Sequence, residues 1–224
     1  MNLINYTDPS PWIWIFNNNG KKVMWFENPR VGSTTIKWFV GHPMKNKNTN
    51  RFKLQILKKG KLAEEKQKMF NKVNESEELS DMYKFAICRD PYRRMVSNYR
   101  MVMKNPLKGS QAPKSTKALK FDTFVDNVVT EKWKNHHFAP QHWFVPFEKI
   151  KFDNIFRLEK LSEDFQIVFD KLGVDDKELV YASSIKNYPL GDYPIEDYTK
   201  NEETLKKIKK YYAKDFELYE RADV

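Results

Sequence analysis

The segment Pro29-Arg30-Val31-Gly32-Ser33-Thr34-Thr35 gathers residue types that bind an anion. Gly32 has no side chain, so the backbone there can approach a ligand closely. Three hydroxyl side chains follow at the expected start of a helix, where free N–H groups point toward a bound phosphate. Arg30 adds a positive charge. The segment predicts a phosphate or sulfate cradle, although it lacks the P-loop spacing G-x-x-x-x-G-K-[ST], and simple N-capping is the alternative.

A second segment, Arg89 to Arg100 (RDPYRRMVSNYR), combines several arginines with a serine. Arg89 lies at the end of an expected strand, and the Asp-Pro pair after it suits the N-cap and first residue of a helix. Arg93, Ser97 and Arg100 are spaced four and three residues apart, so they share one helix face. Guanidinium groups beside a hydroxyl form a phosphate clamp. A solvated basic face is the alternative.

The apolar pattern between these segments predicts strands that alternate with helices. Residues 12–16 and 21–26 form a hairpin around an Asn-Gly turn, and residues 83–88 and 154–158 form further strands. Helices are expected at 61–73 (after a loop from residue 44), at 91–105, at 121–129, at 161–172 before Gly173, and at the C-terminus with Leu205, Ile208 and Tyr212 inward. The pattern favours an α/β fold with three layers, α/β/α, and a mainly parallel central sheet. In such sheets ligands bind at the carboxyl ends of the strands, where both segments lie.

The two segments together resemble the signatures by which sulfotransferases bind 3′-phosphoadenylyl sulfate (PAPS), above all in the carbohydrate branch called family 2. That family pairs a Pro-Lys-x-[Gly/Ala]-x-[Thr/Ser] loop with an Arg-Asp-Pro…Arg-x-x-Ser-x-Tyr segment. Three later stretches are also similar to family motifs and follow in family order: His137-Phe-Ala-Pro-Gln141, Phe156-Arg-Leu-Glu159-Lys-Leu161 and Tyr212-Ala-Lys-Asp215-Phe216. The resemblance runs from about residue 23 to residue 219.

This resemblance implies a P-loop nucleotide-hydrolase-like sulfotransferase fold, with PAPS as donor, adenosine 3′,5′-bisphosphate as product and no metal. Arg30, Val31, Gly32, Ser33, Thr34 and Thr35 would bind the phosphosulfate, and Arg89 and Ser97 would hold the 3′-phosphate. The acceptor would carry a hydroxyl, and a carbohydrate is the class expected. Nothing in the loops at 42–60, 104–120 and 186–200 identifies it.

Sulfonate transfer should proceed by in-line displacement, as phosphoryl transfer does, with a base that takes the proton of the acceptor hydroxyl. The motif match selects His137 as this base; its neighbours His136 and His142, and then Glu159, are the alternatives. Arg30 stands where the family usually has Lys. Arginine can stabilise the charge of the leaving oxygen but is a poor proton donor, so a required general acid would have to be Lys37, or the enzyme would be slow.

Two other classes of function are alternatives, one suggested by the strand–loop–helix arrangement of the first segment and one by the positive charge. Forty Lys and Arg against thirty Asp and Glu give a net charge of +10, which favours anionic partners. A P-loop kinase or nucleotide hydrolase would need Gly-Lys-[Ser/Thr] and an acidic residue at a strand end. A basic nucleic-acid-binding domain would need a continuous basic stripe, whereas the lysines are spread over 45–72, 104–120 and 206–214.

The length of 224 residues suits a single sulfotransferase domain over residues 1–224. Cys88 is the one cysteine of the chain, so no intramolecular disulfide can form. No signal pattern and no apolar run of the roughly 20 residues needed for a membrane span is visible. We therefore expect a cytoplasmic protein without a membrane span. The oligomeric state cannot be read from the sequence.

Overall fold

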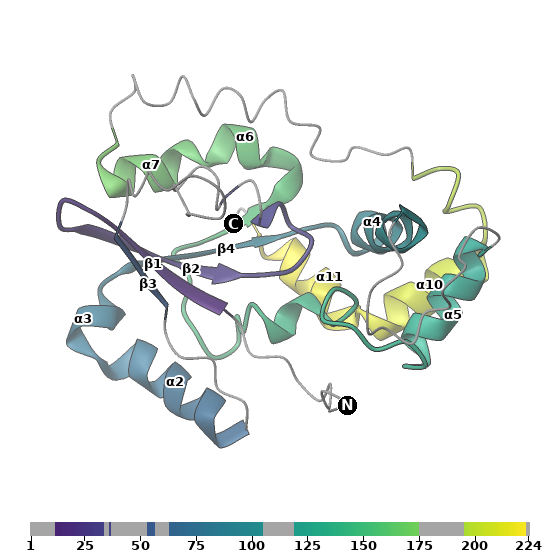
Figure 1. The fold of residues 1–224 in the computed structure, drawn as a ribbon, viewed down its shortest axis with the longest axis horizontal. Coiled ribbons are helices and arrows are strands. Elements are labelled where there is room, and N and C mark those ends of the chain that lie inside the picture. Colours follow the sequence, from purple (N-terminus) through teal and green to yellow (C-terminus); the bar gives the residue numbers. More distant parts are fainter. Residues whose placement is uncertain are drawn as a thin grey trace.

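The computed structural model describes residues 12–33, 36, 53–56, 63–104, 119–174 and 195–222. The described strands form one sheet in the order β3-β1-β2-β4-β5 (Figure 1). They are β1 (Trp12–Asn18), β2 (Lys21–Glu27), β3 (Lys53–Ile56), β4 (Tyr83–Cys88) and β5 (Asn154–Arg157).

The sheet is mixed, so the expectation of a mainly parallel sheet is met only in part. β2 pairs with β4 and β4 with β5 in parallel, whereas β1 pairs antiparallel with both β2 and β3. The reason is the hairpin: a two-residue turn can return the chain only antiparallel. Asn19 and Gly20 form that turn with φ of 49° and 92°, as a type I′ turn requires.

Helices cover both faces of the sheet, so the α/β class and the three layers are confirmed (Figure 1). On one face, α6 (Leu161–Asp164) and α7 (Gln166–Leu172) pack on side chains that include Trp25 and Phe85. On the other, α2 (Ala63–Glu75), α3 (Glu77–Ser80) and α11 (Ala213–Glu220) pack around Met24 and Phe26. Alternate residues of β2 thus enter opposite cores, as the period of a strand dictates.

A third cluster of apolar side chains lies beyond the carboxyl ends of the strands. It joins α4 (Pro91–Lys104), α5 (Phe121–Val129) and α10 (Glu202–Tyr211), at the right of Figure 1. Phe124, Phe138 and Tyr212 are buried in it. This cluster fixes α4 beside the ends of β2 and β4, where the two predicted segments lie.

Three elements differ from the sequence expectation. β3 lies in a stretch predicted to be a loop, and its short pairing with β1 depends on a contact distant in sequence. The helix expected at 161–172 is divided at Phe165. The C-terminal helix is divided at Tyr212, whose φ of −104° and ψ of 28° leave the helical range. Among the described residues, no helix is long and apolar enough to cross a membrane.

Candidate active site

The loop that follows β2 has two residues with left-handed backbone, Arg30 at φ 68° and Gly32 at φ 75°. This conformation costs a residue with a side chain about 1 kcal/mol or more, so Arg30 must be held there by its contacts. A helical turn begins at once: the Ile36 N–H bonds the Gly32 carbonyl at 3.1 Å, and the Ser33 hydroxyl bonds the Asn28 carbonyl at 2.8 Å. Thr34, Thr35 and Lys37 lie outside the described residues.

Arg30 connects the two predicted segments. Its Nη2 donates to the Ser97 hydroxyl at 2.7 Å and to the Ser97 carbonyl at 3.1 Å. Ser97 is buried on α4. The structure therefore brings the first segment onto the second, and the hydroxyl expected to contact the 3′-phosphate is held here by a guanidinium.

Arg89 follows the last residue of β4 and is buried, with its Nε 4.0 Å from Oε1 of Glu159. Glu159 Oε1 also accepts from the Asp90 N–H at 3.3 Å. Asp90 in turn accepts from the Arg93 N–H at 2.8 Å, which is the N-cap that the sequence predicted for α4. Burial raises the pKa of Glu159, while Arg89 partly opposes this shift. Glu159 thus contacts the junction between β4 and α4, where Arg89 and Asp90 lie.

The segment that carries His137 is immobilised through consecutive backbone carbonyls. Asn98 donates to the carbonyl of His137 at 2.9 Å, and Arg94 donates to that of Ala139 at 2.8 Å. The Tyr212 hydroxyl donates to the carbonyl between them, that of Phe138, at 2.5 Å. The backbone around His137 is thus hydrogen-bonded to α4 on one side and to Tyr212, between the two C-terminal helices, on the other.

Burial lowers the pKa of His137 to about 3, with His136, Arg30 and Arg94 adding electrostatic repulsion of the charged form. Its Nδ1 is buried and has no hydrogen-bond partner among the residues that the structure describes. The His136 ring lies 3.9 Å away, centroid to centroid. At neutral pH His137 is therefore an uncharged imidazole.

His142 has a different environment. Its Nδ1 lies 2.8 Å from Oδ1 of Asp215, and its backbone N–H donates to the same oxygen at 3.0 Å. Asp215 is completely buried at the start of α11. These contacts join α11 to the residues after Pro140. His142 therefore differs from the other candidate bases, because its ring is already hydrogen-bonded to a buried carboxylate.

Sequence reasoning missed Arg94 and Asn98 as part of the site. Arg94 is buried, donates from Nε to the Pro29 carbonyl at 3.3 Å, and so links the first loop to the His137 segment. Burial lowers the pKa of Arg94. The signal was present: both polar residues stand four positions apart beside the apolar Met95 and Val102, on the side of α4 that faces the core.

The arrangement suits a ligand with more than one phosphate. Arg30 comes from the junction between β2 and the loop after it, and Arg89 and Arg94 come from the junction between β4 and α4. The hydrogen bonds of Arg30 and Arg94 join these two junctions at the carboxyl ends of β2 and β4, the edge at which parallel sheets bind ligands. The left-handed backbone at Gly32 carries no side chain, so the loop can approach an anion closely there. A nucleotide that carries phosphates at both ends fits this chemistry. The prediction that no metal takes part stays a prediction.

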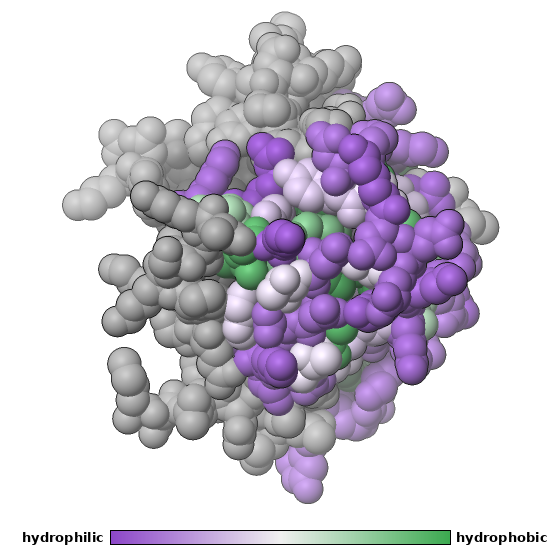
Figure 2. Space-filling view, turned by 90° about the vertical axis from the view of Figure 1, so that its right-hand side faces the viewer, coloured by the Kyte–Doolittle hydropathy of each residue, from purple (hydrophilic) through white to green (hydrophobic). Residues whose placement is uncertain are grey.

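The face over α5 and α10 is largely hydrophilic (Figure 2). Part of its positive charge is paired: Lys207 contacts Asp126 at 2.9 Å and Glu203 at 3.0 Å. Lys207 is thus matched by one carboxylate on α5 and one on its own helix.

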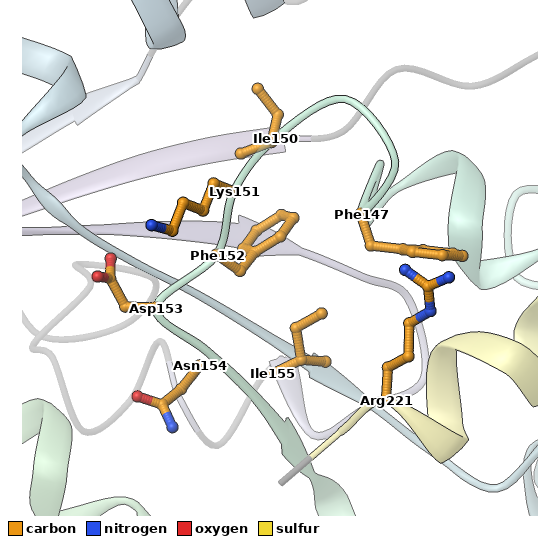
Figure 3. A pocket seen from close by; sticks show the side chains of 8 residues that line it. All are labelled: Phe147, Ile150, Lys151, Phe152, Asp153, Asn154, Ile155 and Arg221. Atoms are coloured by element: carbon orange, nitrogen blue, oxygen red, sulfur yellow. The ribbon is translucent and has the colours of Figure 1, made fainter. Parts of the chain in front are cut away.

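A pocket of 230 Å³ lies elsewhere, between β5, the preceding loop and the end of α11 (Figure 3). Arg221 lies over the ring of Phe147 beside it, 4.9 Å from the ring centroid. None of the predicted site residues lines this pocket. The candidate active site and this pocket are therefore separate parts of the molecule.

Comparison with known protein families gives a match to the one described as "Sulfotransferase family", over residues 14–220. The match includes both junctions, the His137 segment and α11. No curated protein and no solved structure gives a significant match to the chain.

Proposed function

Because the chain belongs to the sulfotransferase family, we propose that it transfers a sulfonate group from PAPS to a hydroxyl of a carbohydrate acceptor. One observation carries the proposal: Arg30 of the first junction reaches Ser97 of the second at 2.7 Å. Two anion-binding segments in contact suit a single nucleotide that presents a phosphosulfate to one and a 3′-phosphate to the other.

The residues of each junction have separate tasks in this proposal. Arg30 and the backbone N–H groups of Val31 and Gly32, with Ser33 and the two threonines after it, would bind the phosphosulfate. Arg89 and Ser97 would bind the 3′-phosphate and so determine how the nucleotide lies. On donor binding, the Ser97 hydroxyl would donate its proton to a phosphate oxygen while its oxygen still accepts from Arg30.

The donor supplies an activated sulfonate group, and the protein supplies its alignment and a base. The neutral His137 would take the proton of the acceptor hydroxyl while the new S–O bond forms and the S–O bond to the bisphosphate breaks. Negative charge grows on the leaving oxygen, and Arg30 would stabilise it. Burial is the main reason for the low pKa of His137, and His136, Arg30 and Arg94 add to it. A bound anion that compensates the charge of the two arginines would make this histidine a stronger base.

The decisive experiment is a thermal shift with adenosine 3′,5′-bisphosphate, with ATP and adenosine 5′-monophosphate as controls. At a hundredfold excess over Kd, binding adds about 2.7 kcal/mol, which raises the Tm of a chain of this size by about 5–10 °C. Transfer of labelled sulfate from PAPS to a panel of carbohydrates, phenols and steroid alcohols then identifies the acceptor class. Equal shifts with ATP and the bisphosphate, together with no transfer, would contradict the proposal.

A further inference from the structure

Gln141 contacts both junctions through a single side-chain amide. It is completely buried and begins the 3-10 turn η1 (Gln141–Trp143). Its Oε1 accepts from the Arg89 backbone N–H and from Asn28 Nδ2, each at 3.0 Å, and its Nε2 donates to the Arg89 carbonyl at 2.8 Å. The amide therefore pairs with both backbone groups of Arg89, as a neighbouring strand would.

These side-chain hydrogen bonds continue the contact between β2 and β4 beyond the last backbone pair of the two strands. The ladder between β2 and β4 ends at Phe26 and Ala86. Just after it, Asn28 Nδ2 also donates to the Ile87 carbonyl at 3.2 Å. The side-chain amides of Asn28 and Gln141 thus hold β2 and β4 together at their carboxyl ends. Beyond this point β2 leads into the Arg30 loop and β4 leads into α4. The separation of the two junctions is set there.

Gln141 is itself held by the C-terminal helix. Its backbone N–H donates to Oδ2 of Asp215 at 2.7 Å, while Oδ1 accepts from the N–H of His142. Asp215 belongs to α11, which leads back from α10 toward the sheet (Figure 1). Hydrogen bonds to a buried carboxylate are among the stronger ones in proteins, so this contact fixes the turn and with it the amide.

We propose that Gln141 is a positioning residue that sets the distance between the two nucleotide-binding junctions, and that Asp215 holds it in place. The inference rests on the proposed function, because it assumes one ligand that spans both junctions. Gln141 touches neither nucleotide nor acceptor; it acts through the backbone of Arg89 and through Asn28. Loss of the amide should then penalise a ligand that binds both junctions more than one that binds a single junction.

The test variant is Gln141→Met, which keeps the length of the side chain and removes all three hydrogen bonds. The matched control is Asn18→Leu, which removes an amide donor to the Leu172 carbonyl at the distant end of the sheet. Dissociation constants for adenosine 3′,5′-bisphosphate, adenosine 5′-monophosphate and adenosine 3′-monophosphate are measured by calorimetry, below the melting temperature of every variant.

We expect Gln141→Met to weaken the bisphosphate by about tenfold or more and each monophosphate by less than about threefold, as the loss of about one well-formed hydrogen bond implies. Asn18→Leu should leave all three constants within about twofold. Equal losses for bisphosphate and monophosphates in Gln141→Met would reveal a merely structural role and overturn the proposal, as would unchanged constants.

Hydrogen exchange of the Arg89 amide gives a readout that needs no ligand. Because the Gln141 side chain accepts from this amide, Gln141→Met should accelerate its exchange by about tenfold or more, while the core amide of Phe85 keeps its rate. In Asn18→Leu the Arg89 amide should exchange at the wild-type rate. If the wild-type protein binds none of the nucleotides, the proposed function fails, and exchange alone decides whether Gln141 holds the junction. An unchanged Arg89 rate would then overturn that role.

Discussion

The guanidinium of Arg30 and the hydroxyl of Ser97 lie 2.7 Å apart although 67 positions separate the residues in the chain. The contact joins the loop after β2 to the second turn of α4. If the proposed donor binds here, the Ser97 O–H can donate to its 3′-phosphate while the Ser97 oxygen keeps the hydrogen bond from Arg30. One hydroxyl would then connect the phosphosulfate site to the 3′-phosphate site.

Ser97→Ala tests the contact to the 3′-phosphate. A charge-assisted hydrogen bond contributes about 1.5–3 kcal/mol, so affinity for adenosine 3′,5′-bisphosphate should fall about ten- to hundredfold. Affinity for adenosine 5′-monophosphate, which lacks the 3′-phosphate, should stay within about threefold. Ser80→Ala is the control, because Ser80 lies on α3, far from the candidate active site. Equal weakening of both nucleotides would show that Ser97 acts on the fold and not on the phosphate.

Arg89→Ala should also weaken bisphosphate binding by about ten- to hundredfold, for the same reason. The change removes the cation beside Glu159, so the pKa of that carboxyl should rise further. Calorimetric titration with the bisphosphate measures the loss of affinity. Arg221→Ala, which removes an exposed arginine, is titrated in the same way as the control. An affinity equal to that of the wild type would remove Arg89 from the donor site.

His137→Ala should abolish sulfonate transfer and leave bisphosphate binding nearly intact, because the ring would serve the acceptor and not the donor. Single-turnover transfer of labelled sulfate, with binding measured in parallel, separates the two effects. His136→Ala is the matched control, since its ring is the immediate neighbour. Turnover that survives in His137→Ala but not in Glu159→Gln would move the role of base to Glu159.

The pH dependence of stability follows from the depressed pKa of His137. Between pH 6.5 and about 3 the unfolded chain binds the proton and the folded chain does not, so acidification through this window favours unfolding. The contribution is at most about 1.4 kcal/mol per pH unit. Urea unfolding at pH 7 and pH 5 should therefore show a smaller loss on acidification for His137→Gln than for the wild type. Identical losses would contradict the shift.

Arg94→Met should destabilise the protein by about 2–4 kcal/mol, because it leaves the Pro29 and Ala139 carbonyls without their donor in a buried setting. Urea unfolding measures the change, with Lys104→Met on the same helix as the control. A loss below about 0.5 kcal/mol would mean that these carbonyls find other partners.

Much of the fold was predictable because its determinants are local. The strand at 83–88, the helix at 121–129, the Asn-Gly hairpin and the stop at Gly173 follow from apolar period and turn chemistry within a few residues. The mixed sheet, β3 and the breaks at Phe165 and Tyr212 depend on contacts with distant residues, which periodicity does not reveal.

The sequence by itself determined which two strands are followed by residues that can bind an anion. Glycine, hydroxyl and arginine side chains have this ability wherever they occur together, so a short segment is enough to identify them. Only the tertiary structure decided which polar side chains are buried together: Arg30 with Ser97, Arg94 with Ala139, and Gln141 with Arg89. Such pairs form between segments 45 to 67 positions apart. A buried polar group must find a partner, but the chain alone does not say which residue will lie within reach.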